Sequence, residues 1–413
     1  MSAHVRIDDL AAPELSDMQR AAIAAVPDVA MDKDAVLAAA RQATGLSDFG
    51  ARDFEDRLEI WLRSFDEDEG LGPLGRAGLF GDCVRHASNR LRIEDMIARH
   101  PEIAQVAIDR PIVIAGLPRS GTTHLVNILA GDPRLRSMPL WETMEPVPDG
   151  GVTPMGDDPR RLRTEAMWGQ FEALLPLMPA MHEMAPDHVH EDIELQGPDF
   201  SAYIPEWTSR PHRWRDHYLA ADQTPHYAYA RRTLQLLTWL KGPDRWVMKS
   251  PPHMENFGPL MRTYPDATVV VTHRDPVAVI QSAITMIAYG DRIRRSIIDL
   301  PVLAAYWIDR VETLLRRCVR DRDILPEEQT IDVYFDQWTK DPDPILREIY
   351  RRADLPLTDE ALTALHAYLD AHEEKQTHRI VYDLERDFGV TADELRQRFG
   401  FYFDRFPVKP EVR

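Results

Sequence analysis

Residues 110–125 read Arg-Pro-Ile-Val-Ile-Ala-Gly-Leu-Pro-Arg-Ser-Gly-Thr-Thr-His-Leu, and they set the architecture of this chain. An apolar run rich in β-branched residues gives way to a glycine-containing loop, after which apolar residues recur at helical spacing. This pattern predicts a strand, a tight loop and a helix. Gly116 and Gly121 allow the loop to turn several N–H groups toward one anion, and the helix adds the positive end of its dipole. We therefore expect a phosphate-binding loop rather than a turn with incidental glycines.

The side chains of this loop indicate which type of anion it is suited to bind. Its residues are Pro118, Arg119, Ser120, Gly121, Thr122 and Thr123. Arg119 adds a fixed charge, and the three hydroxyls add donors. The glycine spacing matches that of nucleotide triphosphatases, but Thr122 stands where their motif has the lysine that bridges the β- and γ-phosphates. The loop therefore suits a shorter anion, such as a 5′-phosphosulfate, better than a triphosphate.

Composition indicates a soluble globular protein. The chain has 413 residues, of which 44% are hydrophobic and 28% charged, values typical of that class. Cys83 and Cys318 are its two cysteines, too few for a disulfide framework or a cysteine metal cage, which fits a reducing cytosol. The first residues carry acids without an apolar core, and no later apolar run is long enough to span a bilayer. We expect a cytoplasmic protein without a transmembrane segment.

The formal net charge of −19 disfavours two classes of partner. Nucleic acids and polyanionic polysaccharides require a broad basic face, which an acidic chain lacks. We therefore expect no nucleic-acid partner. A polyanionic nucleotide has to be held by a local cluster of arginines, lysines and helix N-termini.

The order of elements predicts an α/β fold. Strands and helices alternate from Pro111 onward, which is typical of a parallel sheet flanked by helices. The expected strands are 111–116, 139–146, 245–249, 267–272 and 330–335. A long helix is expected near residues 300–320. From Leu355 the chain is expected to be helical apart from a loop at 376–389.

Two further regions surround this sheet in the predicted organisation. Residues 1–105 show helical spacing and are expected to pack on the α/β domain at 106–413, either as a collar for an acceptor pocket or as a plain extension of the core. Residues 150–244 interrupt the alternation and are rich in Pro, Met, His, Trp and Tyr. We expect a partly helical insertion over the active site; an ordinary irregular subdomain is the alternative.

Polar residues follow three of the expected strands. In open parallel sheets the ligand lies outside the carboxyl ends of the strands. The phosphate-binding loop, Lys249 and Arg274 all occupy such positions. Arg274 can grip a phosphate monoester through two N–H groups, and Ser282, two helical turns later, adds a donor. A capping salt bridge at Arg274-Asp275-Pro276 is the alternative.

Together these motifs resemble those of a bacterial branch of the sulfotransferase family, whose donor is 3′-phosphoadenosine 5′-phosphosulfate. The resemblance covers roughly residues 30–390. Its motifs are Gly116 to Thr123, Trp141-Glu142, Lys249-Ser250-Pro251, Arg274-Asp275-Pro276 with Ser282, and Tyr382-Asp383-Leu384 near Phe388-Gly389. The resemblance implies transfer of a sulfuryl group to a hydroxyl or amine without a metal. The loop would hold the 5′-phosphosulfate, Arg274 and Ser282 the 3′-phosphate, and Lys249 the transferring group.

These motifs leave three candidates for the base that removes the acceptor proton. Cytosolic sulfotransferases have a histidine two residues after the lysine, where this chain has Pro251. In tyrosylprotein sulfotransferases a glutamate takes this role, and Glu142 occupies the similar region here. Its apolar neighbours predict partial burial, which raises a carboxyl pKa toward the useful range. An ion pair with a core arginine is the alternative function for Glu142, and His253 and Glu145 are alternative bases.

Other polar residues are candidates for contacts with the ligands. Tyr334, Lys375, His378 and Arg379 are expected near the adenine or the 3′-phosphate. His182, His188 and His190 lack further spaced ligands for a metal, so we expect them at the acceptor entrance. The acidic balance and the composition of 150–244 predict a small or lipid-like acceptor.

Two other functional classes share part of this pattern. A kinase-like phosphotransferase would share the loop, but it needs the loop lysine and acidic magnesium ligands at a strand end. The strand at 267–272 leads into His273 and Arg274 instead. A non-catalytic nucleotide-binding module would keep the loop and Arg274 without requiring Glu142 or Lys249.

Overall fold

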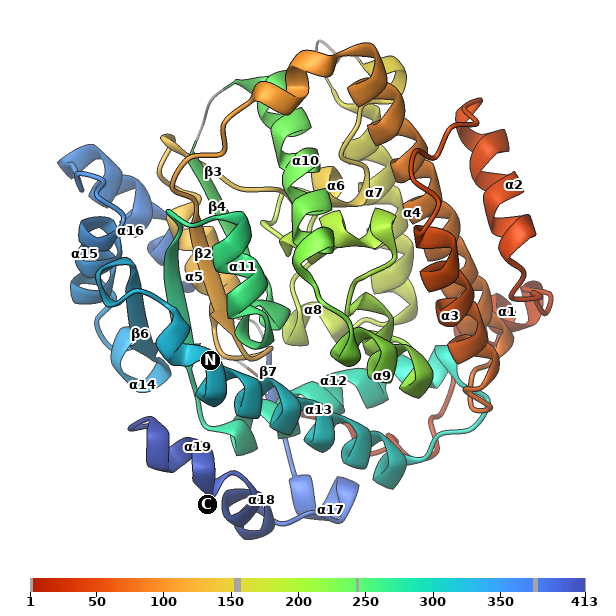
Figure 1. Ribbon diagram of the computed structural model, residues 1–413. Coiled ribbons are helices and arrows are strands. Elements are labelled where there is room, and N and C mark those ends of the chain that lie inside the picture. The colour runs from red at the N-terminus through yellow and green to blue at the C-terminus, as the bar shows by residue number, and fades with distance from the viewer. Residues whose placement is uncertain (1–2, 152–156, 243–244, 374–377, 413) are drawn as a thin grey trace.

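A parallel sheet of five strands lies at the centre of the α/β domain (Figure 1). The computed structural model describes residues 3–151, 157–242, 245–373 and 378–412. The strand order is β3-β4-β2-β5-β6, with every neighbouring pair parallel. The strands are β2 Ile112–Gly116, β3 Leu135–Arg136, β4 Arg245–Lys249, β5 Thr268–His273 and β6 Thr330–Tyr334. Their carboxyl ends therefore meet at one edge, and the predicted fold class is confirmed.

Strand β2 is buried on both faces, as its unbroken apolar run predicts. Ile112 and Ile114 belong to a cluster with α5 (Thr122–Leu129), α15 (Asp343–Arg352) and α16 (Asp359–Glu373). Val113 and Ala115 alternate with them and join the larger core, which includes residues of α12 (Pro276–Arg294) and α13 (Leu300–Asp321). Helices thus cover both faces of the sheet. The strand that precedes the β2–α5 loop is held between two apolar layers.

The N-terminal region is helical except at its start. Its helices are α1 Asp17–Ala25, α2 Lys33–Thr44, α3 Phe54–Asp66, α4 Pro73–Arg99 and the 3-10 turn η1 Pro101–Gln105. The expectation of helix throughout is wrong at β1 (Ala3–Arg6), which pairs in parallel with β7 (His378–Val381). Neither segment shows an apolar run of its own, and the two strands pair from opposite ends of the chain, so no local pattern predicted them.

The region expected as an insertion is partly helical and lies between the N-terminal helices and the sheet (Figure 1). Its elements are η2 Asp149–Gly151, α7 Pro159–Leu174, α8 Met178–Met181, η3 Asp192–Asp199, η4 Ile204–Trp207, α9 His212–Ala220 and α10 Thr224–Lys241. Helix α10 contacts α4 on one side and α11 (Phe257–Thr263) on the other. The insertion is therefore built into the core rather than attached at its edge.

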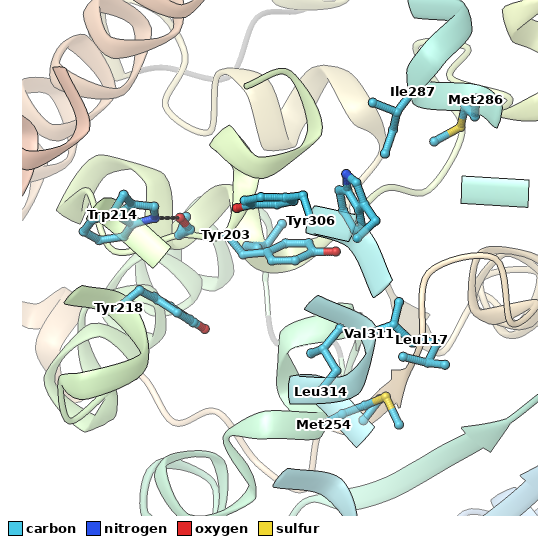
Figure 2. Close-up of a cluster of buried hydrophobic side chains, with 14 of the residues drawn as sticks. Leu117, Tyr203, Trp214, Tyr218, Met254, Met286, Ile287, Tyr306, Val311 and Leu314 are labelled. Carbon is cyan, nitrogen blue, oxygen red and sulfur yellow. Dashed lines mark hydrogen bonds between the residues drawn. The ribbon is translucent and has the colours of Figure 1, made fainter. Parts of the chain in front are cut away.

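Aromatic side chains join the insertion to the elements beside the loop (Figure 2). Tyr203, Trp214 and Tyr218 pack with Met254 of η5 (Pro251–Glu255) in one buried cluster. Residues of α12 and α13 and Leu117 of the β2–α5 loop complete this cluster. The loop and the insertion thus share one packed layer.

A buried charge network fixes the same junction. Arg310 of α13 is fully buried and donates to Glu206 of η4 at 3.0 Å and to Glu255 of η5 at 2.6 and 2.8 Å. Each buried carboxylate needs this partner, since an unpaired charge in the interior is strongly destabilising. The contacts hold the turn that follows Lys249 against the insertion.

Two local expectations are wrong. Residues 139–146, expected to contain a strand, form helix α6 (Leu140–Met144) instead. The strand of this region is β3, which ends at Arg136 and is an edge strand of two residues, too short to leave a recognisable apolar run. The loop expected at 376–389 contains β7 and helix α17 (Leu384–Phe388) in its described part. The remaining elements are η6 Arg322–Ile324, η7 Glu327–Gln329, α14 Phe335–Trp338, α18 Ala392–Arg398 and α19 Gly400–Arg405. Across the four described ranges, no helix is long and apolar enough to cross a membrane.

Candidate active site

The loop between β2 and α5 has a tightly determined backbone. A Cβ at Gly116 would lie 1.8 Å from Oγ1 of Thr272 on β5, so no larger residue fits there. Gly121 has a φ of 84°, in the left-handed region that glycine adopts without strain. Arg119 also has a positive φ, of 65°, which is unusual for a residue with a side chain. The strand, the glycines and the neighbouring strand together impose this shape.

The hydroxyl groups of the loop divide into two sets. Ser120 is fully buried, and its Oγ donates to the carbonyl oxygen of Leu117 at 2.6 Å and lies 2.9 Å from Oγ1 of Thr272. This hydroxyl therefore stabilises the loop. The first N–H groups of α5 have no partner inside the helix, and Thr122 and Thr123 begin that helix. These groups can receive an anion.

Lys249 lies against the start of α5. It ends β4, and its side chain is 1% exposed. Its Nζ donates to Oγ1 of Thr123 at 3.0 Å and to Oε1 of Glu191 at 2.8 Å. A desolvated ammonium group thus lies beside the N-terminal residues of α5, as its position at a strand end predicted.

Glu191 is a site residue that the sequence reasoning missed. Helix α5 positions it through Asn127, whose Oδ1 accepts from the N–H of Val189 at 3.0 Å and whose Nδ2 donates to its carbonyl at 3.3 Å. Val189 also forms a bridge with Pro139. The signal in the sequence was an acid directly after His188-Val189-His190. The contact between Glu191 and Lys249 depends on long-range packing, which no local sequence pattern indicates.

Two of the three histidines considered at the acceptor entrance lie near this pair. The rings of His182 and His190 are 6.2 Å apart. Burial lowers the pKa of both, and the nearby charge of Lys249 helps to bring that of His190 to about 3. Both rings are therefore neutral at physiological pH. Within the described residues, no group of three or more His, Cys, Asp or Glu side chains is placed to hold a metal ion.

A second cationic cluster lies at the other end of the loop. Arg119 donates from Nε to Oγ of Ser282 at 3.1 Å, and that hydroxyl donates to the Tyr382 hydroxyl at 3.2 Å. Arg274 donates from Nη1 to the carbonyl oxygen of Arg119 at 2.6 Å. Burial lowers the pKa of Arg119, and the charge of Arg274 acts in the same direction. The structure therefore brings Arg119 to Ser282, although the sequence grouped it with the 5′ contacts.

Glu142 has surroundings other than those expected. It lies in α6 and is 1% exposed, but its Oε1 is 2.6 Å from Nζ of Lys241 and 3.3 Å from Nη2 of Arg136. The expected burial is confirmed, but the expected strand-end position and apolar surroundings of the carboxylate are wrong, because Glu142 lies in a helix on which Arg136 of β3 and Lys241 at the end of α10 converge. The ion-pair alternative describes its contacts, and its use as a base stays a prediction.

The alternative bases are also engaged in contacts. His253 is 2% exposed and lies between Oδ1 of Asp192 at 3.1 Å and the Tyr227 hydroxyl at 2.7 Å. Glu145 accepts two hydrogen bonds from Arg163. Both ring nitrogens of His253 therefore have partners, and a role as base would require these contacts to change.

The residues expected near the nucleotide base lie in two strands and in a stretch outside the described residues. Tyr334 ends β6 and stacks on the ring of His273, with centroids 5.2 Å apart. His378 and Arg379 belong to β7. Lys375 lies outside the described residues. Tyr334 therefore contacts the end of the neighbouring strand β5, and its position in the sequence did not indicate this contact.

The geometry provides two cationic subsites along one loop. Lys249, Thr123 and the start of α5 form the first, and Arg119, Arg274 and Ser282 form the second. Such an arrangement suits a ligand with two separate anionic groups. Glu191 adds a carboxylate at the first subsite, and a carboxylate can accept a proton from a neighbouring group.

Solved structures with a similar fold include two mycobacterial enzymes. Sulfotransferase STF1 from Mycobacterium tuberculosis is 28% identical, with a TM-score of 0.78 over 89% of this chain and 98% of the other. Sulfotransferase STF9 from Mycobacterium avium is 26% identical, with a TM-score of 0.81 over 92% of this chain and 98% of the other. No curated protein sequence matches the chain significantly.

The family comparison matches the part of the chain that contains both subsites. The model of the sulfotransferase family matches residues 111–359, from the start of β2 to the start of α16. This range is more than half of the chain and includes Lys249, Arg274 and Ser282. Of the three functional classes that the sequence left open, this match supports one: the chain belongs to the sulfotransferase family and is a sulfotransferase enzyme.

Proposed function

We propose that the enzyme transfers a sulfuryl group from 3′-phosphoadenosine 5′-phosphosulfate to a hydroxyl or amine of a small or lipid-like acceptor. The observation that carries this proposal is the pair of cationic subsites on one loop, at Lys249 and at Arg274. The loop lacks the lysine that a triphosphate requires. The donor has two anionic ends, one for each subsite.

The residues of the first subsite take the 5′-phosphosulfate in this proposal. The N–H groups at the start of α5 and the hydroxyls of Thr122 and Thr123 would bind its oxygens. Lys249 would stabilise the oxygen that leaves as the sulfuryl group moves, because negative charge develops there during transfer. In the second subsite, Arg119, Arg274 and Ser282 would hold the 3′-phosphate.

Glu191 is our choice for the base. It lies 2.8 Å from Lys249, so a donor anion that attracts the ammonium group would weaken that ion pair and leave the carboxylate free for the acceptor proton. Glu142 and His253, the bases predicted from the sequence, are each held by two partners. Separate substitutions of the three residues distinguish them.

The proposed acceptor follows from the apolar residues that pack beside the loop and from the charge of the chain. The aromatic and apolar cluster in Figure 2 reaches Leu117 of the loop, and the net charge of −19 opposes a polyanionic polymer. We therefore expect an apolar alcohol or phenol to be sulfated in preference to a polyuronate. Competition between the two acceptor types with labelled donor measures this, and preferential labelling of the polyuronate would contradict it.

Donor choice tests the proposal by binding alone. Adenosine 3′,5′-bisphosphate should bind far more tightly than AMP or ATP, because it alone offers a 3′-phosphate to the second subsite. Arg274→Ala should remove this preference at a cost of roughly 1.5–3 kcal/mol, the range for a charge-assisted hydrogen bond. Calorimetry with the three nucleotides measures both effects.

Arg213→Ala is a matched control for this measurement. It removes an arginine that also pairs with a glutamate, Glu67, but on the exposed surface. The control should keep the preference for the bisphosphate. Equal affinities of the parent enzyme for the three nucleotides would contradict the proposed donor.

A further inference from the structure

A carboxylate of the chain itself binds the guanidinium group of the second subsite. Arg274 donates from Nε to the two carboxylate oxygens of Glu411 at 2.9 and 3.2 Å, and from Nη2 to Oε2 at 2.8 Å. This fork-to-carboxylate geometry is the one with which arginine binds a phosphate monoester. Glu411 therefore uses the donor groups that a 3′-phosphate would need.

The backbone near Glu411 is attached to the same motif. Oδ2 of Asp275, the residue after Arg274, accepts from the N–H of Glu411 at 2.7 Å and from that of Val412 at 3.4 Å. Oδ1 of Asp275 caps α12 by accepting from Val277 at 2.9 Å. Both charged side chains of the Arg-Asp-Pro motif thus bind the C-terminal segment, which we define as residues 406–412.

Two further contacts fasten this segment across the strand ends. The ring of Phe406 packs on His273, at the end of β5, with centroids 4.1 Å apart. Lys409 pairs with Asp336 of α14 at 2.5 Å. The segment therefore runs along the edge of the sheet from which the second subsite is built.

The pair that closes the subsite is only partly buried. The side chain of Arg274 is 21% exposed and that of Glu411 is 28% exposed. A partly exposed ion pair contributes little to stability, so an entering anion of higher charge can replace the carboxylate at small cost. Arg274 keeps its stacking on Phe335, at 3.9 Å, and its bond to the Arg119 carbonyl as fixed supports.

We propose that Glu411 is an internal competitor for the 3′-phosphate, and that donor binding displaces the C-terminal segment from Arg274. This inference rests on the proposed donor. It adds that the segment lowers the affinity for nucleotides with a 3′-phosphate and leaves the affinity for those without one unchanged. The position of the segment then depends on whether a 3′-phosphate occupies the second subsite.

Calorimetry on the full chain tests the competition. Glu411→Gln keeps the size of the side chain and removes its charge, so the affinity for adenosine 3′,5′-bisphosphate should rise about fivefold, as expected for loss of a partly exposed competing ion pair. The affinity for AMP should not change. Glu67→Gln, which removes an exposed carboxylate paired with Arg213, is the control and should alter neither affinity.

Hydrogen exchange on the unsubstituted enzyme tests the displacement independently of any variant. Adding adenosine 3′,5′-bisphosphate should speed exchange at the amides of Glu411 and Val412, because their bonds to Asp275 break, whereas AMP should not. Faster exchange together with the gain in affinity supports the proposal. A gain in affinity without faster exchange would indicate plain charge repulsion and would overturn the displacement.

The remaining outcomes separate this inference from the proposed function. If the bisphosphate binds tightly, but Glu411→Gln has no effect on its affinity and exchange at the segment stays unchanged, the inference is wrong and the donor assignment stands. If the bisphosphate binds neither the parent nor the variant, the donor assignment fails and the inference fails with it.

Discussion

Replacement of Lys249 by alanine is expected to lower turnover by about two to three orders of magnitude, the size seen when one preorganised charge in a transition state is lost. The ammonium group is desolvated beside Thr123 at the start of α5, where a weak charge interaction in water becomes strong. Donor affinity should fall much less, because the loop amides and the second subsite remain. Single-turnover rates and donor calorimetry measure the two quantities separately.

Lys241→Ala is the matched control for this substitution. Lys241 also pairs with a glutamate, Glu142, but it lies at the end of α10 and not at the β2–α5 loop. It should change turnover by no more than a few-fold. Turnover of Lys249→Ala within a few-fold of the parent, with an unchanged unfolding temperature, would remove Lys249 from the mechanism.

Glu191→Gln is expected to have the second large effect. The amide keeps the shape of the side chain and its contact with Lys249, but it cannot take the proton from the acceptor substrate. Turnover should fall by about 10²–10⁴-fold, the range for loss of a general base, while donor affinity changes little. Initial rates at saturating donor and acceptor measure this loss.

An acidic phenol provides the internal control for the role of Glu191. A phenol with a pKa below the assay pH arrives deprotonated and needs no base. It should restore turnover in Glu191→Gln but not in Lys249→Ala. Failure of this rescue would indicate that Glu191 only positions Lys249.

The bases predicted from the sequence are tested in the same assay. Glu142→Gln should lower the temperature of unfolding, since Arg136 and Lys241 each lose one charged contact, and should leave turnover within a few-fold. His253→Ala should likewise lower the temperature of unfolding, because it removes the ring that Asp192 and Tyr227 contact. An active Glu191→Gln together with an inactive Glu142→Gln or His253→Ala would move the base to that residue.

The parts of the structure that the sequence predicts are those that local patterns determine. A parallel strand that is buried on both faces is rich in apolar residues, which is why β2 and β5 were recognisable. Strands β4 and β6 include polar residues, but their short apolar stretches between helical segments fitted the same alternation. The glycines of the loop are required by a close approach to Thr272 and by a left-handed φ, so their spacing indicated the turn. The cations at strand ends followed, because parallel strands present their carboxyl ends at one edge.

The parts that the sequence does not predict depend on contacts between distant segments. Strands β1 and β7 pair across nearly the whole chain, and neither has a pattern of its own. Glu191 reaches Lys249 because Asn127 fastens Val189 to α5, and Glu142 has ion pairs because two separate elements supply its cations. Such meetings are set by tertiary packing rather than by spacing along the chain.

Transfer of a radiolabelled sulfuryl group from 3′-phosphoadenosine 5′-phosphosulfate to a panel of hydroxylated acceptors tests the central claim most directly. The proposed function predicts a labelled product with at least one apolar alcohol or phenol, formed by the parent enzyme and nearly lost in Lys249→Ala. Phosphate transfer from γ-labelled ATP to the same panel, with no sulfuryl transfer to any acceptor, would contradict it.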